Sequence, residues 1–270
     1  MPLSDFMNDP ARRWLMLQRD LGGDEVILDA PLSATPGVAA PIPGAVAPPE
    51  AASADPKPGA DSRAAWPPIP GRGLVVAPAF PASPSAWHSL DAIADVVREC
   101  RQCPLCRTRT HAVPGEGDSR AALMVVGEGP GESEDRSGRP FVGRAGELLD
   151  KMLAAIEVPR ATAYIANVVK CRPPKNRVPL PDEREACMPY LARQIELVRP
   201  RVLLALGGTA AEALLGVKTS LGQLRSKVHE WHGIPLVVTY HPAALLRNPN
   251  WKRPAWDDVR IVRQLLDRHA

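Results

Sequence analysis

The five cysteines of this 270-residue chain are spaced in a way that predicts a metal or cluster site. Cys100, Cys103 and Cys106 form a C-x2-C-x2-C pattern, and Cys171 and Cys187 follow it further along the chain. Four thiolates can hold a tetrahedral zinc ion or an iron–sulfur cluster, which leaves one cysteine spare. The spacing by itself does not separate zinc from iron–sulfur.

Glycine and polar residues occur at the ends of four short apolar runs, at 121–126, 163–169, 202–206 and 235–240. Helical patterns lie between and around these runs, at 88–99, 144–157, 182–198, 208–215 and 255–268. Short runs rich in Val and Leu that alternate with helices are typical of a parallel sheet covered on both faces. We therefore predict a three-layer αβα domain with a mainly parallel, four-stranded sheet.

In such open sheets, ligands bind outside the carboxyl ends of the strands. Glu128, Asn167, Thr209 and His241 all lie at these ends, so we expect acids, an amide, a glycine turn and an imidazole to meet at one edge. The loop that begins at Gly127 contains three glycines and several acids, but it lacks both the GK[ST] ending and the GxGxxG spacing of phosphate loops. Its acids would also repel phosphate and are better suited to positioning water or stabilising a developing cation.

Two residues in this region allow both a structural and a functional interpretation. Phe141 is the one phenylalanine of the predicted domain and lies in a polar, glycine-flanked loop. It could stack on a planar ligand such as a base, or it could close the loop over the core. A lone histidine such as His241 is more often structural, but its place beside Glu128 and Asn167 favours a functional role.

Proline divides the chain into regions. Of the 31 prolines, 14 lie between Pro31 and Pro84, so we interpret residues 31–85 as a disordered linker. Residues 1–30 contain a short predicted helix, at 8–21, which could dock on the domain or on a protein partner. Residues 86–270 form the predicted domain. Its 27 Lys and Arg against 21 Asp and Glu make it mildly basic, which is compatible with a polyanionic partner.

No apolar run is long enough to cross a membrane, and residues 1–14 lack the apolar core of a signal peptide. We therefore expect a monomer in the reducing cytoplasm with no membrane contact, where cysteines serve as thiols or ligands rather than in disulfides.

Taken together, the segments resemble the family 4, iron–sulfur uracil-DNA glycosylases over about residues 86–265. The resemblance rests on an ordered series: CRQC, VPGEGD, VVGEGPGESEDRSGRPFVGRAGELLDKML, NVVKCRPPKNRVPLPDE, the cysteine of EACMPYL, LALGGTAAEALLG and TYHPAALLRNP. It implies an enzyme that flips uracil out of DNA, hydrolyses its N-glycosidic bond and leaves an abasic site. It also implies a structural [4Fe-4S] cluster on Cys100, Cys103, Cys171 and Cys187, with Cys106 spare.

The resemblance also implies roles for individual residues. Phe141 would stack on the flipped uracil, Asn167 would read its polar edge, and His241 would donate to a uracil oxygen as the base leaves. Glu128 or Glu134 would handle water or face the sugar, and the two stay undecided. The remaining implied roles are pocket lining by Gly127, Gly129 and Pro130, filling of the vacated stack by Leu246 and Arg247, and phosphate contacts by Lys170, Arg172, Lys175 and Arg177.

The sequence departs from the family at two points, and two other functions remain as alternatives. Ser226 stands where the family commonly has glycine, so the loop there could differ. No histidine occurs between His111 and His229, so the covalent trapping of uracil seen in a related class is not expected. The rivals are a uracil or DNA-damage sensor that has lost turnover, and an unrelated zinc-stabilised α/β hydrolase.

Overall fold

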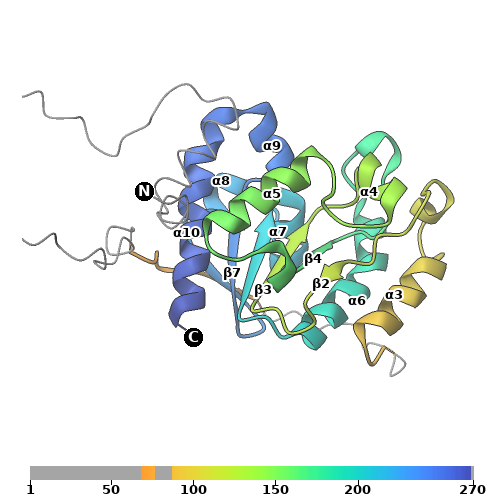
Figure 1. Ribbon diagram of the computed structural model, residues 1–270, viewed down its shortest axis with the longest axis horizontal. Helices are drawn as coiled ribbons and strands as arrows, with labels where there is room; N and C mark the ends of the chain where they lie inside the picture. The colour runs from red at the N-terminus through yellow and green to blue at the C-terminus, as the bar shows by residue number, and fades with distance from the viewer. Residues whose placement is uncertain (1–67, 77–86, 269–270) are drawn as a thin grey trace, which may run out of the picture. The chain divides into compact units, whose positions relative to one another are not determined.

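The computed structural model describes residues 68–76 and 87–268, whose strands form one sheet (Figure 1). The strand order across the sheet is β1-β6-β7-β5-β3-β4-β2. The bounds are β1 Arg72–Val76, β2 Glu116–Gly117, β3 Leu123–Gly127, β4 Ala163–Asn167, β5 Val202–Leu206, β6 Val228–Trp231 and β7 Ile234–Thr239.

The four central strands are parallel, and they are the four that the apolar runs predict. β3 pairs in parallel with both β4 and β5, and β5 pairs in parallel with β7. Every residue of β3, β4 and β5 is buried, which explains why these strands read as continuous apolar runs. The α/β class is therefore confirmed.

The predicted number of strands is wrong, because the described sheet has seven strands rather than four. The additional strands are β2, which pairs antiparallel with β4, and β6 and β1 at the other edge. β2 has only two residues, and the burial of β6 alternates along its length. Short or alternating strands give a weak sequence signal compared with the fully buried ones.

Strand β1 also corrects the predicted linker, since residues 72–76 lie inside the stretch interpreted as disordered. The strand pairs in parallel with β6, and the Leu74 N–H donates to His229 Nδ1 at 3.0 Å. A Cβ on Gly73 would lie 2.5 Å from the same nitrogen. The glycine therefore lets the histidine ring approach the strand, and proline counting does not detect such a contact. The predicted helix at 8–21 lies outside the described residues.

Helices pack on the sheet in two groups. α5 and α10 contact one another, and α10 also contacts β7 and β5 (Figure 1). α6 contacts β4 and α3, while α7 contacts β5 and β3. The helix bounds are α3 Leu90–Glu99, α4 Glu132–Ser137, α5 Arg144–Ala155, α6 Pro181–Val198, α7 Gly208–Leu215, α8 Leu221–Leu224, α9 Pro242–Arg247 and α10 Lys252–Arg268. Short 3-10 turns are η2 Pro104–Arg107, η3 Arg160–Thr162, η4 Pro174–Asn176 and η5 Pro249–Trp251.

The connections place a switch in strand order next to β3. The chain passes from β3 to β4 on one side, and β5 pairs with β3 on the other side. Loops that leave β3 and β5 therefore diverge and open a crevice between them, where open α/β sheets bind their ligands. The sequence predicts acids and a glycine turn at this place.

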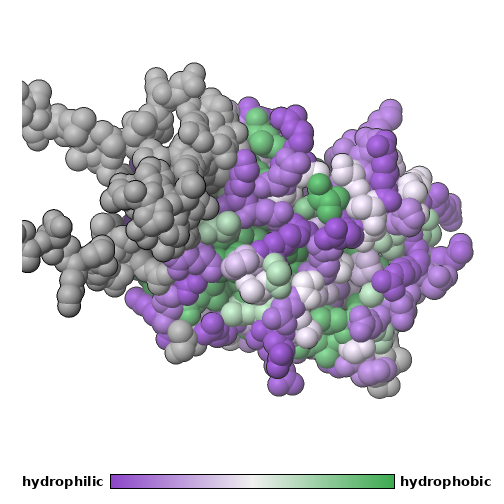
Figure 2. Space-filling model, viewed as in Figure 1, coloured by the Kyte–Doolittle hydropathy of each residue, from purple (hydrophilic) through white to green (hydrophobic). Residues whose placement is uncertain are grey.

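On the face shown in Figure 2, hydrophilic residues cover most of the coloured surface and hydrophobic residues form smaller separate patches. Within residues 68–76 and 87–268, no helix is long and apolar enough to span a membrane.

Ser226 has a left-handed backbone conformation, with φ at +56°. The side chain is exposed, and it follows Arg225, which is buried and ion-paired with Asp258 at 2.7 Å. Left-handed backbone is unfavourable for residues with a Cβ and costs glycine nothing. Ser226 thus adopts a backbone conformation that glycine would adopt without this strain.

We expect Ser226→Gly to raise the free energy of unfolding by about 0.5–1 kcal/mol, because glycine removes the left-handed strain. Chemical denaturation of the two proteins measures the difference. Ser220→Gly is the matched control, since Ser220 has a φ of −65° and gains nothing from glycine. An equal or lower stability of Ser226→Gly would contradict the prediction.

Candidate functional site

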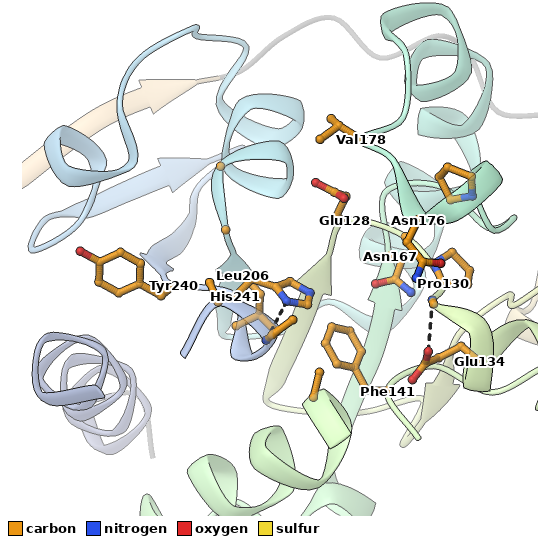
Figure 3. Close-up of a pocket in the computed structure, with 18 of the residues that line it drawn as sticks. Glu128, Pro130, Glu134, Phe141, Asn167, Asn176, Val178, Leu206, Tyr240 and His241 are labelled. Carbon is orange, nitrogen blue, oxygen red and sulfur yellow. Dashed lines mark hydrogen bonds between the residues drawn. The ribbon is translucent and has the colours of Figure 1, made fainter. Parts of the chain in front are cut away.

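A pocket of about 620 Å³ lies at the carboxyl ends of the central strands (Figure 3). Figure 3 shows Glu128, Asn167, Phe141 and His241 directed toward a common space. These residues come from the loop after β3, the end of β4, the loop before α5 and the end of β7. The lining residues that the sequence predicted are Glu128, Gly129, Pro130, Glu134, Phe141, Asn167, Arg177, His241 and Arg247.

Asn167 is the last residue of β4 and is buried, with 1% of its surface exposed. Its side-chain Oδ1 is buried and has no hydrogen-bond partner within residues 68–76 and 87–268. Burying an amide oxygen without a partner costs about 1–3 kcal/mol, so such groups in native proteins need an explanation. A ligand N–H that donates to this oxygen at the pocket wall would explain why the protein leaves it unpaired.

Gly127 ends β3 directly beneath this amide. A Cβ on Gly127 would lie 2.4 Å from Asn167 Oδ1 and 2.5 Å from the Phe141 ring, distances that no real Cβ tolerates. Gly127 is buried and is absent from the residues that line the pocket. Its predicted role as a lining residue is therefore wrong, and its function is to leave room for the amide and the ring.

Phe141 has a left-handed backbone, with φ at +52°, and its side chain is 5% exposed. Its ring lies 5.5 Å from the His241 ring, centroid to centroid, at an interplanar angle of 30°. The ring therefore forms one side of the pocket, next to the imidazole. This placement combines the two interpretations of the sequence, because the side chain is both buried in its loop and presented to the pocket.

The strained loop is held by Arg160. Its guanidinium donates to the carbonyl oxygens of Phe141 at 2.9 Å and Pro140 at 2.6 Å. The same guanidinium forms ion pairs with Glu116 at 2.6 Å and Asp150 at 2.9 Å. Backbone held outside its preferred conformation persists only where surrounding contacts determine it, and Arg160 provides them.

Glu134 is fully engaged with backbone N–H groups. Its Oε1 accepts from Val142 and Gly143, each at 2.9 Å, and its Oε2 accepts from Gly131 at 3.1 Å. The carboxylate thus connects the loop after β3 to the loop that carries Phe141. Hydrogen bonds from N–H groups to a charged acceptor are stronger than neutral ones. The geometry therefore favours a positioning role for Glu134.

Glu128 is differently placed. Its Oε2 accepts a hydrogen bond of 2.5 Å from the Thr209 hydroxyl, which lies near the start of α7 on the other side of the crevice. This single contact fixes one carboxylate oxygen, and the other has no hydrogen-bond partner among the described residues. Glu128 is therefore the carboxylate with capacity to bind water.

His241 is the N-cap of α9, and its Nδ1 accepts a hydrogen bond from the Ala243 N–H at 3.2 Å. An imidazole that accepts at Nδ1 carries its proton on Nε2 when neutral. The pKa of His241 is lowered to about 4, first by burial and second by the charge of Arg247, while Glu134 opposes this shift. At neutral pH the ring is therefore an uncharged donor.

Lys170 does not match its predicted role. The side chain is buried, and its Nζ donates to the Asn167 carbonyl at 2.9 Å and to Gln194 Oε1 at 2.6 Å. An amine enclosed by protein acceptors cannot reach a DNA phosphate, so this prediction is wrong. Lys170 instead stabilises the backbone of the residue whose amide lines the pocket.

The other predicted phosphate contacts lie on the loop between β4 and α6. Arg172 forms an ion pair with Glu132 at 3.6 Å, and Arg177 holds the buried Glu183 through two bonds of 2.7 and 2.8 Å. Lys175 is exposed. On the opposite side, Arg247 ends α9 and is exposed, and Leu246 is partly buried and does not line the pocket.

The four predicted cluster ligands lie in one region, although they come from distant parts of the sequence. Cys100 and Cys103 pack against a core cluster that contains Cys171 and Cys187, and Cys103, Cys171 and Cys187 interact electrostatically. Cys171 Sγ accepts from Arg109 at 3.0 Å, and Cys187 Sγ accepts from the Lys170 N–H at 3.3 Å. In the part of the chain that is described, no group of three or more His, Cys, Asp or Glu side chains has metal-holding geometry.

Several site residues were not singled out from the sequence. Thr209 was noted only as part of a glycine turn, and nothing marked Arg160, which lies outside the pocket. Tyr240 and Trp251 line the pocket and stack on each other. The one available signal was that Tyr240 directly precedes the candidate histidine.

Comparison with known proteins identifies relatives of this arrangement. The family model of the Uracil DNA glycosylase superfamily matches residues 114–260. The type-4 uracil-DNA glycosylase of Saccharolobus solfataricus is 46% identical over 187 residues, which is 66% of this chain and 87% of that protein. That of Thermotoga maritima is 47% identical over 185 residues, covering 67% and 96%. A type-5 uracil-DNA glycosylase of Pyrobaculum aerophilum is 34% identical over 150 residues, covering 49% and 66%.

We expect Glu134→Gln to lower the free energy of unfolding by about 1–3 kcal/mol. In the variant, the amide NH2 would face a backbone N–H that in the wild type donates to a carboxylate oxygen. Denaturant titration measures the loss. Glu132→Gln on the same helix is the control, since Glu132 forms an exposed ion pair with Arg136, and such pairs contribute less than about 1 kcal/mol. Equal effects of the two substitutions would show that Glu134 does not organise the loops.

Proposed function

This chain belongs to the type-4 uracil-DNA glycosylases of the uracil-DNA glycosylase superfamily, and we propose that it excises uracil from DNA in base excision repair. The reaction extrudes the nucleotide, hydrolyses the N-glycosidic bond, and releases free uracil and an abasic site. The observation that carries the proposal is the buried Oδ1 of Asn167, which has no hydrogen-bond partner among the described residues and lies in one pocket with Phe141 and His241. An amide, a ring face and an imidazole donor are the groups that a pyrimidine needs.

Base selection follows from the chemistry of the amide. Uracil presents an N–H donor beside a carbonyl acceptor, and the Asn167 side chain offers an acceptor and a donor. Cytosine presents the opposite pattern on that edge, so it would leave polar atoms of the buried site unpaired. A site built around such a hydrogen bond rejects the wrong partner strongly. The Phe141 ring stacks on the base and holds it in this orientation.

Bond cleavage places negative charge on the departing base. His241 donates a hydrogen bond from its Nε2–H to the uracil oxygen where this charge develops, as an oxyanion hole does. The neutral ring suits the task, because it is a hydrogen-bond donor at neutral pH. Glu128 binds the attacking water through its free oxygen and faces the cationic sugar, and Thr209 fixes its orientation.

DNA binding uses both sides of the pocket. Arg172, Lys175 and Arg177 lie on one side and contact phosphates, which adds affinity without choosing the base. On the other side, Leu246 and Arg247 at the end of α9 occupy the space that the extruded nucleotide leaves in the stack.

The cysteine region fits an iron–sulfur cluster. Four sulfur atoms from the segment after α3, the loop after β4 and α6 lie in one region, and two of them accept N–H bonds, which is the donor set of [4Fe-4S] sites. Cys100, Cys103, Cys171 and Cys187 would hold the cluster, and Cys106 is spare. The cluster would supply structural cross-linking of these segments, and the chemistry at the base uses the protein's own side chains.

The deciding experiment is a cleavage assay on a labelled oligonucleotide with one uracil, using protein purified without oxygen. Strand breakage after alkali reports the abasic site, and strands with thymine or hypoxanthine in the same place are the controls. Uracil-specific breakage supports the proposal. A folded protein that binds the strand and breaks nothing would instead be a sensor. Absorbance near 400 nm distinguishes iron–sulfur from zinc.

We expect Asn167→Asp to reduce the preference for uracil over cytosine, expressed as a ratio of kcat/KM, by about 100-fold or more, because a carboxylate offers only acceptors. Asn176→Asp makes the same chemical change at another residue of the pocket wall and is the control. An unchanged preference in Asn167→Asp would remove the amide from the reading role.

The pKa of His241 predicts the acid limb of the pH profile. Since burial lowers this pKa to about 4, activity should be independent of His241 titration from pH 7 to about pH 5 and should fall toward pH 4. A rate that rises between pH 7 and pH 5 would show that the charged ring is the active form.

The same pKa predicts a change in stability. In the unfolded chain the pKa of His241 is near 6.5, so between about pH 6.5 and pH 4 the unfolded state binds more protons and the free energy of unfolding falls as pH falls, by up to about 3 kcal/mol. His241→Asn keeps an acceptor at the N-cap and removes the titration. It should flatten this part of the stability profile, as measured by denaturation at several pH values.

A further inference from the structure

The pocket is longer than the region around Asn167, Phe141 and His241. Its wall continues past His241 to Tyr240, Leu221 and Trp251, and Figure 3 shows Tyr240 on the other side of His241 from Phe141. A single pyrimidine held between the Phe141 ring and the Asn167 amide therefore occupies one end of a space of about 620 Å³. The other end has walls that the proposed reaction does not use.

This second end is built around an aromatic stack. The rings of Tyr240 and Trp251 lie 4.8 Å apart, centroid to centroid, and are inclined by only 11°. Trp251 keeps 38% of its surface exposed, whereas Trp87, Trp231 and Trp256 are each at most 9% exposed. Large aromatic side chains are usually buried when only the core requires them. An exposed tryptophan that lines a pocket offers surface to a ligand.

The stack is supported from within the domain. The guanidinium of Arg225 lies 4.2 Å from the centre of the Tyr240 ring, a cation–π contact. Arg225 is held in place by Asp258 at 2.7 Å and by the Pro254 carbonyl at 2.6 Å, and Asp258 also accepts from Thr239 at 2.7 Å. A buried ion pair with all these partners fixes the aromatic rings before any ligand arrives.

The position of Trp251 places it beside the residues proposed to enter the DNA. It ends η5, which follows α9 directly and contacts it, and α9 carries Leu246 and Arg247. Arg247 is exposed and lines the same pocket. Aromatic rings next to basic side chains bind single-stranded nucleic acid, because every base has a face to stack and every nucleotide has a phosphate.

From this geometry we infer that Trp251, supported by Tyr240, is a second base-binding site that stacks on a nucleobase next to the extruded uracil in the same strand. The inference rests on the proposed function and extends it from one nucleotide to two. Stacking on an aromatic face is tolerant of base identity, so this site contributes affinity for the strand and leaves the choice of uracil to Asn167.

The test combines a substitution in the protein with the removal of one base from the DNA. The DNA probes are single-stranded oligonucleotides with one uracil, and matched strands in which the nucleotide on the 5′ or on the 3′ side carries a stable abasic analogue. For the wild-type protein, loss of the neighbouring base on one side should raise KM about tenfold and leave kcat within about twofold. Trp251→Ala should raise the KM for the complete strand by the same factor of about ten. For this variant, removal of the neighbouring base should cause no further increase in KM.

Two variants control for folding and for general loss of apolar surface. Trp251→Phe keeps an aromatic face and should retain a KM within about threefold of the wild type. Val96 on α3 has the same exposed fraction as Trp251, 38%, and does not line the pocket. Val96→Ala therefore removes apolar surface elsewhere and should leave the KM for every DNA strand unchanged. A KM increase for Trp251→Ala that is the same with and without the neighbouring base overturns the inference, as does an unchanged KM.

The stacking inference and the proposed function fail separately. Binding of uracil-free strands with and without the neighbouring base, measured by fluorescence anisotropy, tests the stack without any cleavage. Wild-type protein that binds these strands with a base-dependent affinity but cuts no uracil strand overturns the proposed function alone. Cleavage of uracil with the same affinity for both kinds of strand overturns the stacking site alone.

Discussion

The pocket depends on a close approach that only a residue without a Cβ permits. Gly127 ends the central strand β3, and both the Asn167 amide and the Phe141 ring occupy the space that a Cβ there would fill. The amide and the ring reach this point from different elements, one on the neighbouring strand β4 and one on the loop before α5. Because both approach the backbone at the same residue, the base-reading group and the stacking group are set at a fixed relation to each other. The remaining contacts of the site keep these two groups in place.

The charged residues around the pocket serve distinct purposes, and their partners show which. Glu134 accepts three backbone N–H bonds and Arg160 donates to two carbonyls, so both act on the conformation of the Phe141 loop. Lys170 is enclosed beneath Asn167 and supports its backbone. Glu128 has one contact across the crevice and faces the pocket with its other oxygen. Groups whose hydrogen bonds are complete within the protein hold the structure, and groups with unused capacity meet the ligand.

The two ends of the pocket divide the work of recognition. In the proposed function, the end formed by Asn167, Phe141 and His241 makes directional hydrogen bonds to the base, which discriminate between bases. The end formed by Tyr240 and Trp251 makes a stacking surface, which is tolerant of base identity and adds affinity. His241 and Tyr240 are adjacent in sequence and face different ends, so a single peptide joins the two ends. The Arg225–Asp258 ion pair fixes the second end to α10.

The sequence alone determined the central strands, most of the helices and the group of residues that meets at their carboxyl ends. Buried parallel strands are continuous apolar runs, and polar residues directly after them must converge, so Glu128, Asn167 and His241 were predictable. Tertiary structure alone decided what each group does there. Lys170 looks like a basic phosphate contact in sequence, but packing against Gln194 buries it. Glu134 and Glu128 look equivalent, yet only one meets three backbone N–H groups. Strand β1 forms by pairing with the distant strand β6, and the Tyr240–Trp251 stack joins residues on different elements. Local composition does not identify such partners, so neither feature was predictable from the sequence.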